Sequence, residues 1–436
     1  MRRHVALGQL AHPPANVHNV GHMTLSEELT WRGFVNQTTL PDITALDADK
    51  KLTFYWGVDP SADSMQVGNL AIAMMVRHFI AAGHQAVLLV GGATGLIGDP
   101  DGKAQERDLK PLEEIVHNKQ AIIGQYRRIF AGLDFDIVDN YDWFKGLGYL
   151  EFLRDVGKHV PMRQMLGREF VQSRLSESGA GISYAEFSYS LIQGYDFLHL
   201  FREKAVTLQV CGADQWGNSI AGVELIRRIA GAEAHIWSAP LVVNKATGVK
   251  FGKSEAGAVW LDDTKTSIYQ FYQFWLNVDD DGVEDYLKIY TLLDKAAIDQ
   301  TMQEFTANRG GRAAQRRLAY EVTKLVHGKK KVDTVQRASA VLFGERSSEE
   351  LGMNEFEILK AELPVVICKR TEVVNMPQLL EEAGLANSKS DARRLIAAGA
   401  VTVNGQHPDV DIAIELRMGD NLLRKGKNSF AIIVYE

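Results

Sequence analysis

Residues 54–70 have the sequence FYWGVDPSADSMQVGNL, and this stretch indicates the fold of the chain. Residues 52–56, which overlap the apolar start of this stretch, favour a β-strand. The end of the stretch begins a helix that runs from about Gln66 to His78. The segment between them is rich in Gly, Pro, Asp and Ser, which is typical of loops. In open α/β sheets, ligands bind beyond the carboxyl ends of strands, where helix N-termini offer N–H groups to anions. The stretch therefore predicts an anion-binding site.

A second apolar run follows this helix and completes a βαβ unit. Residues 86–90 have the sequence AVLLV, and a strand that is apolar on both faces is typical of a parallel sheet. Alternating strand and helix patterns continue to about residue 242. Two amphipathic helices, expected at 149–159 and 162–175, do not fit that alternation, and we interpret them as an insertion. The pattern predicts a Rossmann-type α/β domain over residues 23–262.

The rest of the chain predicts two further domains. Residues 263–345 have helical periodicity almost throughout, so we expect an all-helical domain there. Residues 346–375 are rich in Glu and Ser at their start, and we interpret them as a linker. Residues 376–436 favour two helices and then short strands, as in a small α+β domain. The first 22 residues contain four His and two Pro without periodicity, so we expect a disordered leader.

Composition excludes several classes of protein. With 436 residues, of which 46% are hydrophobic and 24% charged, the chain can form two or three domains with full cores. A net charge of −7 excludes a uniformly basic nucleic-acid-binding protein but permits local basic patches. Two cysteines, Cys211 and Cys368, exclude a disulfide framework and favour a reducing compartment, so we expect a cytoplasmic protein. No apolar run approaches the roughly 18 residues of a membrane helix, so no membrane partner is expected.

Two glycine-containing segments carry candidate ligand-binding groups. GGATGLIGDP at 91–100 and KFGKS at 250–254 match neither standard phosphate-binding motif. The first segment can be a simple tight turn, but Asp99 at a strand exit would suit an ammonium group. Lys250 and Lys253 can be solvated charges, or they can be two cations that neutralise a polyphosphate during a transfer reaction.

Five segments, in order along the chain, resemble the motifs of class I aminoacyl-tRNA synthetases. PSADSMQVGN at 60–69 resembles the HIGH signature, and KFGKS resembles the KMSKS signature. GGATGLIGDP, YSLIQGYDF at 189–197 and LQVCGADQWGN at 208–218 are similar to the intervening motifs of bacterial tyrosyl-tRNA synthetases. The resemblance extends from about Met23 to the C-terminus, and the tail is similar to S4 RNA-binding modules.

This resemblance implies a reaction and its partners. It implies a tyrosine-tRNA ligase, which activates tyrosine with ATP to give tyrosyl-adenylate and pyrophosphate. The tyrosyl group then passes to the 3′-terminal ribose of tRNA(Tyr). Mg²⁺ should accompany ATP, without a dedicated metal site on the protein. FLRDVGKHVPMRQM at 152–165 is similar to the family's dimer interface and implies a homodimer.

The resemblance also assigns residues to the two substrates. Tyr55 and Asp196 would bind the phenolic hydroxyl of tyrosine. Its amino group would contact Asp99, Tyr189 and Gln193, with Gln215 near its carboxylate. The residues implied at the nucleotide are Gly57, Asp59, Gly68, Asn69, Gly212, Asp214, Lys250, Lys253 and Ser254. The residues implied in catalysis are Ser61, Gln66, Lys103, Arg107, Lys250 and Lys253.

The chain departs from the family pattern in the first signature. Gln66 replaces the first histidine of HIGH and Asn69 replaces the last, while Gly68 is retained. Glutamine still donates an N–H but cannot carry a charge, so we expect weaker stabilisation of phosphate. Without the resemblance, Tyr55 and Tyr189 would be interpreted as ordinary core aromatics.

Basic residues in two regions are candidates for RNA contacts. Lys389, Arg393 and Arg394 lie in the S4-like segment 388–405, for which a solvated helix face is the alternative. A second surface is expected in the helical domain, for the anticodon arm. Its residues are Arg309, Arg312, Arg316, Arg317, Lys329, Lys330 and Lys331.

Two other functions fit the same scaffold. One is a non-catalytic RNA-binding paralogue that has lost the chemistry of the first signature, although the intact tyrosine-binding set and KFGKS argue against it. The other is activation of tryptophan, which Asp196 and the S4-like tail disfavour.

Overall fold

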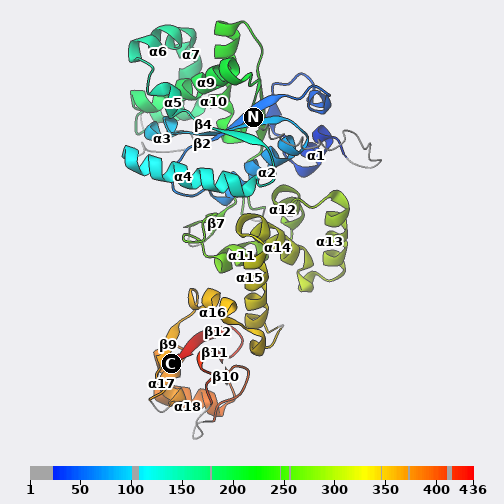
Figure 1. The fold of residues 1–436 in the computed structure, drawn as a ribbon, viewed down its shortest axis with the longest axis vertical. Coiled ribbons are helices and arrows are strands. Elements are labelled where there is room, and N and C mark those ends of the chain that lie inside the picture. The colour runs from blue at the N-terminus through cyan, green and yellow to red at the C-terminus, as the bar shows by residue number, and fades with distance from the viewer. Residues whose placement is uncertain are drawn as a thin grey trace, which may run out of the picture.

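The computed structural model describes residues 23–100, 108–176, 179–245, 247–254, 257–344, 346–371, 374–409 and 415–436. An α/β domain lies at the top of Figure 1, a helical domain in the middle and a small α+β domain at the bottom. This order confirms the fold class predicted from the sequence. The predicted leader at 1–22 lies outside the described residues.

The α/β domain is built on a six-stranded sheet. Its strands are β1 (Gln37–Thr38), β2 (Thr53–Val58), β3 (Gln85–Val90), β4 (Phe135–Asp139), β5 (Leu208–Gly212) and β6 (His235–Ala239). The spatial order is β1-β6-β5-β2-β3-β4, with β1 antiparallel to β6 and the other neighbours parallel. The order reverses between β5 and β2, and such a reversal opens a ligand-binding crevice at the carboxyl ends of the strands.

Side chains of β2 alternate between the two faces of the sheet. Phe54 and Trp56 belong to the core that also contains α2 (Val67–Ala81) and α4 (Leu112–Ile129). Tyr55 points to the other face and packs with Phe197 of α9 (Tyr184–Lys204). Because both faces are covered by helices, β2 is buried, and its carboxyl end is where the chain can reach a ligand.

The other helices of this domain include those of the insertion. They are α1 (Leu25–Arg32), α3 (Thr94–Ile97), α5 (Tyr141–Phe144), α6 (Tyr149–Asp155), α7 (Met162–Leu166), α8 (Glu169–Leu175) and α10 (Trp216–Leu225). The insertion differs from the expected pair of helices at 149–159 and 162–175. It consists of shorter pieces, because a 3₁₀ turn begins at Gly157, Pro161 follows it, and Gly167 ends α7.

The helical domain packs directly on the α/β domain, and the two share one hydrophobic core. Its helices are α11 (Ile268–Leu276), α12 (Val283–Tyr290), α13 (Lys295–Ala307), α14 (Ala313–His327) and α15 (Lys329–Leu342). Ser267 and Asp294 cap α11 and α13 by accepting backbone N–H bonds from Gln270 and Ala297. None of the helices in the described ranges is both long and apolar enough to cross a membrane.

The C-terminal domain has a four-stranded sheet with helices beside it. Its elements are α16 (Met353–Lys360), β9 (Val365–Cys368), α17 (Met376–Glu382), α18 (Lys389–Ala397), β10 (Val401–Val403), β11 (Gly419–Lys425) and β12 (Ser429–Tyr435). The spatial order is β10-β11-β12-β9, with β9 parallel to β12.

The range interpreted as a linker, 346–375, differs from that expectation. It contains α16 and β9, and β9 buries Val366 and Cys368 in the core of the C-terminal domain. The Glu and Ser residues at its start form a helix cap: Glu349 N–H donates to Ser347 Oγ, and Ser347 N–H donates to Glu350 Oε1. The same residue types favour both linkers and helix caps, so composition alone misled the interpretation.

Candidate active site

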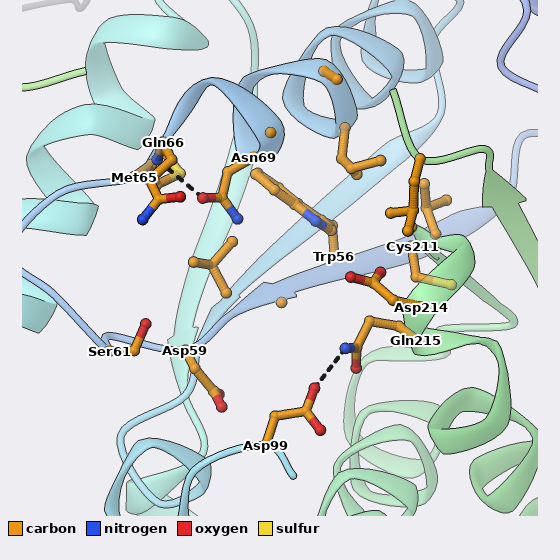
Figure 2. A pocket seen from close by; sticks show the side chains of 18 of the residues that line it. Trp56, Asp59, Ser61, Met65, Gln66, Asn69, Asp99, Cys211, Asp214 and Gln215 are labelled. Atoms are coloured by element: carbon orange, nitrogen blue, oxygen red, sulfur yellow. Dashed lines mark hydrogen bonds between the residues drawn. The ribbon is translucent and has the colours of Figure 1, made fainter. Parts of the chain in front are cut away.

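A cavity of about 380 Å³ opens at the carboxyl ends of β2 and β5, where the strand order reverses (Figure 2). Most residues assigned from the sequence line it together. They are Tyr55, Gly57, Asp59, Ser61, Gln66, Gly68, Asn69, Asp99, Tyr189, Gln193, Asp196, Gly212, Asp214, Gln215 and Lys250. For Lys253 and Ser254 the structure describes only the backbone, which forms the short strand β7 (Lys253–Ser254). Lys103 and Arg107 lie outside the described residues.

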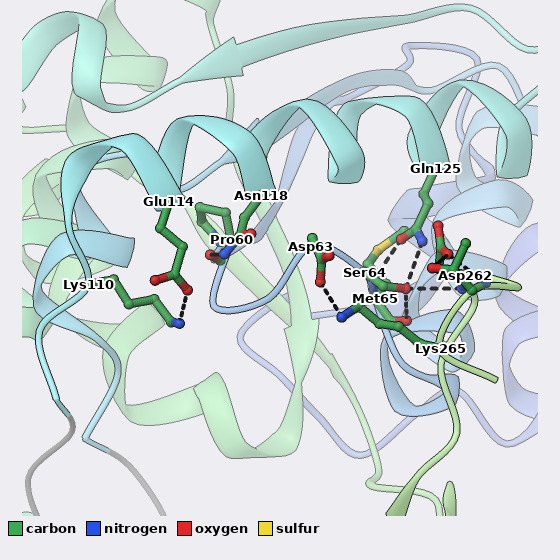
Figure 3. A network of polar contacts seen from close by, with 11 residues as sticks. Pro60, Asp63, Ser64, Met65, Lys110, Glu114, Asn118, Gln125, Asp262 and Lys265 are labelled. Atoms are coloured by element: carbon green, nitrogen blue, oxygen red, sulfur yellow. Dashed lines mark hydrogen bonds and ion pairs between the residues drawn. The ribbon is translucent and has the colours of Figure 1, made fainter.

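Helix α4 holds the loop that joins β2 to α2, as Figure 3 shows. Gln125 accepts a hydrogen bond from the backbone N–H of Met65 at 2.7 Å and donates to Ser64 Oγ at 2.8 Å. Asn118 donates to the carbonyl oxygen of Pro60 at 3.0 Å. These three bonds fix the loop against α4, and Ser61 of the loop lines the cavity.

The first turn of α2 brings the two signature motifs together. The backbone N–H of Gln66, the N-cap residue, donates to Asn69 Oδ1 at 3.0 Å. Val67 N–H donates to the carbonyl of Val259 at 3.1 Å, just after the KFGKS segment. Gly252 of that segment has φ +94°, and a Cβ there would lie 3.3 Å from Cβ of Val67. The positive φ and this close approach together favour glycine at this position.

The buried carboxyl group of Asp196 forms one end of the cavity. Asn140 Nδ2 donates to Asp196 Oδ2 at 3.1 Å, and Trp143 Nε1 donates to Oδ1 at 2.9 Å. Burial raises the pKa of Asp196 well above its usual value, and both hydrogen bonds act in the opposite direction. Burial also raises the pKa of Tyr55, so its hydroxyl stays protonated and can donate. Within the described part of the chain, no group hydrogen-bonds to Tyr55 Oη.

A second network links Asp196 to Asp59 across the floor of the cavity. Asn140 Nδ2 also donates to Thr94 Oγ1 at 3.0 Å, and Thr94 Oγ1 donates to Asp59 Oδ1 at 2.6 Å. Tyr189 Oη donates to Asp59 Oδ2 at 2.7 Å. Sequence reasoning assigned no role to Asn140, Trp143 or Thr94. The position of Asn140, directly after β4, is the signal that could have identified it.

Two predicted tyrosine-binding residues in the lining of the cavity are hydrogen-bonded to each other. Gln215 Nε2 donates to Asp99 Oδ2 at 2.6 Å, as Figure 2 shows. Asp214, beside Gln215, has its pKa raised by loss of hydration, while the nearby Lys250 lowers it. Gln193 also lines the cavity, and none of the described residues hydrogen-bonds to its Oε1. No group of three or more His, Cys, Asp or Glu side chains in the described ranges is arranged to hold a metal ion.

Comparisons with known proteins identify the family. The model of "tRNA synthetases class I (W and Y)" matches residues 47–344, and that of the "Tyrosine--tRNA ligase SYY-like C-terminal domain" matches 355–433. A tyrosine–tRNA ligase of Limosilactobacillus reuteri is 40% identical over 416 residues, which cover 94% of this chain and 99% of that protein. The chain belongs to the tyrosine–tRNA ligase family. A tyrosine–tRNA ligase of Bacteroides fragilis is likewise 40% identical over 442 residues, covering 94% of this chain and 100% of that protein.

Solved tyrosyl-tRNA synthetases share the fold. A C-terminally truncated mitochondrial enzyme of Aspergillus nidulans superposes with a TM-score of 0.67 at 30% identity and covers 74% of this chain and 95% of that chain. The corresponding Coccidioides posadasii structure gives a TM-score of 0.63 at 30% identity, over 72% of this chain and 92% of that chain. The family and fold implied by the sequence motifs are thereby confirmed.

In this member of the family, α12 anchors the KFGKS segment to the helical domain. The ring of Phe251 stacks on that of Tyr286, with centroids 4.3 Å apart and planes 25° apart. Upstream of the segment, Asn244 Nδ2 donates to Asp279 Oδ2 at 3.1 Å, and Lys245 forms an ion pair with Asp285. The position of KFGKS over the cavity therefore depends on the helical domain.

The RNA-contact residues predicted in the tail lie on one helix. Lys389, Arg393 and Arg394 are all exposed on α18. Arg394 forms an ion pair with Asp391 at 2.7 Å, and Lys389 Nζ lies 3.4 Å from Gln378 Oε1. These are weak surface contacts, so the three cations stay accessible to a phosphate backbone.

Proposed function

We propose that this chain activates tyrosine with ATP and transfers the tyrosyl group to the 3′-terminal ribose of tRNA(Tyr). The observation that carries the proposal is a single cavity with a buried hydroxyl–carboxylate pair, Tyr55 and Asp196, at one end. The loop before α2 and Lys250 line the same cavity. A phenol would bind at the buried pair and a triphosphate at the loop and Lys250.

The buried pair accounts for the choice of tyrosine over phenylalanine. The substrate hydroxyl would donate to Asp196 and accept from Tyr55. Phenylalanine would leave the Tyr55 hydroxyl unpaired and would give Asp196 no donor, a selectivity for which tyrosyl-tRNA synthetases are the known example. The substrate ammonium would lie at Asp99, with Tyr189 and Gln193 beside it and Gln215 near the carboxylate.

The activation step needs positioning and charge neutralisation. An oxygen of the tyrosine carboxylate attacks the α-phosphorus of ATP, and the bond to the bridging oxygen breaks as pyrophosphate leaves. No general base is required, because a carboxylate is already ionised at neutral pH. Ser61 and Gln66 would donate to phosphate oxygens, and Lys250 and Lys253 would neutralise the departing pyrophosphate. The substrate would be the Mg²⁺ complex of ATP.

The remaining nucleotide roles follow from position around the cavity. Gly57, Asp59, Gly212 and Asp214 would line the nucleoside, since they border the crevice between β2 and β5. Gly68, Asn69 and Ser254 would complete the phosphate site. Lys103 and Arg107 would add positive charge to the pyrophosphate.

We further propose a cytoplasmic homodimer that holds its tRNA on two surfaces. Exposed apolar side chains of the insertion support the dimer: Tyr149 is 63% exposed, Leu150 78% and Met162 57%. The cations of α18 and of the helical domain would contact the phosphate backbone.

Tyrosine-dependent exchange of pyrophosphate into ATP tests this proposal. We expect exchange with tyrosine, none with phenylalanine or tryptophan, and charging of tRNA(Tyr). Exchange with tryptophan in place of tyrosine would show activation of the other amino acid. A chain that binds tRNA but exchanges no pyrophosphate would be the non-catalytic paralogue.

A further inference from the structure

A row of hydrogen bonds leads from the insertion to Asp99. Arg168, which precedes α8, donates from Nη1 to Asn218 Oδ1 at 2.7 Å. Asn218 Nδ2 in α10 donates to Gln215 Oε1 at 3.2 Å. Gln215 Nε2 then donates to Asp99 Oδ2 at 2.6 Å. The row thus connects a residue of the insertion to the cavity through two side-chain amides.

The groups at the two ends of this row set its direction: the Arg168 guanidinium only donates, and the Asp99 carboxylate only accepts. An amide side chain can present either its oxygen or its nitrogen to a neighbour, but a guanidinium has donors and no acceptor. Asn218 must therefore turn its oxygen to Arg168, which leaves its nitrogen for Gln215. Gln215 in turn presents its oxygen to Asn218 and its nitrogen to Asp99. Each amide has a single orientation that satisfies the whole row.

Packing around the row supports this arrangement. Asn218 is only 2% exposed, so water cannot readily replace its partners. Ser219 Oγ donates to the backbone carbonyl of Gln215 at 2.8 Å and holds the first turn of α10. A Cβ on Gly217 would lie 3.3 Å from Arg168 Nη2, so this glycine leaves space for the guanidinium.

We propose that Arg168 is a positioning residue for amino-acid recognition: it orients Asn218 and Gln215 so that an N–H donor always faces Asp99. The inference rests on the proposed role of Asp99 as the ammonium-binding group. Gln215 holds one carboxylate oxygen of Asp99 and thereby aims the carboxylate at the substrate. Because Arg168 belongs to the insertion, recognition of tyrosine then depends on a segment outside the cavity.

Arg168→Gln tests the proposal, because an amide at this position can donate or accept and no longer sets the direction. We expect the KM for tyrosine in pyrophosphate exchange to rise roughly tenfold, as for one weakened bond to a charged group, with kcat little changed. Arg168→Lys, which keeps a donor-only cation, should restore most of the affinity. Arg202→Gln is the control, since Arg202 is an exposed arginine in the last turn of α9.

Two tyrosine analogues separate positioning from general damage. Tyramine keeps the ammonium group and lacks the carboxylate, whereas 4-ethylphenol lacks both groups. Arg168→Gln should weaken inhibition by tyramine about tenfold, as for tyrosine, and leave inhibition by 4-ethylphenol unchanged. Equal weakening of both inhibitors, a fall in kcat at unchanged KM, or no change at all would overturn the proposal.

Two further variants keep the test decisive. Asn218→Asp can only accept at this position, so Gln215 would turn its nitrogen away from Asp99, and the same loss of tyramine affinity is expected. Asp99→Asn examines the underlying assignment by the same comparison. If Asp99→Asn does not weaken inhibition by tyramine selectively, the ammonium-binding role of Asp99 is wrong. If Asp99→Asn does so but the Arg168 and Asn218 variants do not, the positioning role of Arg168 is wrong.

Discussion

The hydroxyl of Tyr189 donates a hydrogen bond to Asp59 at 2.7 Å, although the two residues lie 130 positions apart. Tyr189 belongs to the residues assigned to the amino acid and Asp59 to those assigned to the nucleotide. The bond therefore joins the two substrate sites. The pKa of Tyr189 is raised, mainly by burial, so its hydroxyl remains protonated and can donate at neutral and mildly alkaline pH.

Tyr189→Phe should weaken the binding of both substrates. Removal of a hydrogen bond to a charged group costs about 1.5–3 kcal/mol, so we expect the KM for tyrosine and that for ATP to rise roughly tenfold or more. Steady-state pyrophosphate exchange measures both values. Tyr195→Phe is the matched control on the same helix, because the Tyr195 ring packs against Phe144 and Phe152. An unchanged KM for ATP in Tyr189→Phe would show that the two sites are independent.

Gln66→His should accelerate activation. A protonated imidazole makes a charge-assisted bond to phosphate that is about twice as strong as the neutral amide bond, so we expect kcat to rise several-fold. The gain should increase as the pH falls through about 6.5, the usual histidine pKa. Single-turnover formation of tyrosyl-adenylate measures this step.

The fold should tolerate this change, because Asn69 Oδ1 accepts from the backbone N–H of residue 66, a bond that any side chain at this position retains. Gln66→Ala, which removes the donor, is expected to slow the reaction. If Gln66→His forms adenylate no faster than the unaltered chain at any pH, the phosphate-donor role of Gln66 is wrong.

Tyr286→Leu should loosen the KFGKS segment. The substitution removes the ring on which Phe251 stacks, and we expect a higher KM for ATP together with a lower kcat. Phe305→Leu is the control, since Phe305 is equally buried in the same domain but lies on α13. Both variants should lose thermal stability, and only the first should change the kinetics of activation. Identical kinetics in the two variants would remove any role for the stack.

His327 should make the helical domain sensitive to acid. Burial lowers the pKa of His327 to about 4, and its ring packs edge-on against Phe271 at 4.9 Å. Between pH 6.5 and 4 the unfolded chain binds a proton at this site that the folded chain does not. The free energy of unfolding therefore decreases as the pH falls from 6.5 to 4, by about 3 kcal/mol.

Urea unfolding at pH 7, 5 and 4 compares the unaltered chain with His327→Leu. The variant lacks the titrating group, so its unfolding free energy should fall less over this range. Parallel pH profiles for the two proteins would mean that His327 protonates equally well in the folded and unfolded states.

Local sequence patterns were sufficient for the fold class and for the loop after β2, whereas most of the other residues around the cavity were assigned by the resemblance to the family. The apolar run 86–90 predicted a buried parallel strand, and the loop after β2 placed Asp59, Ser61 and Gln66 at a strand exit. Such predictions succeed because side-chain periodicity and turn-forming residues act over a few positions, and the chain carries that information wherever it folds.

Contacts between distant segments emerged only in three dimensions. Gln215 and Asp99 are 116 positions apart, and Trp143 and Asp196 are 53 apart, yet each pair is hydrogen-bonded at the cavity. The division of the insertion into short helices and the packing of β9 against β12 likewise depend on their surroundings. These features require loop closure and the burial of polar groups against particular partners, which no local pattern encodes. The stretch 54–70 thus predicted a binding site, and the packing of the rest of the chain around it selected the groups that a substrate would meet.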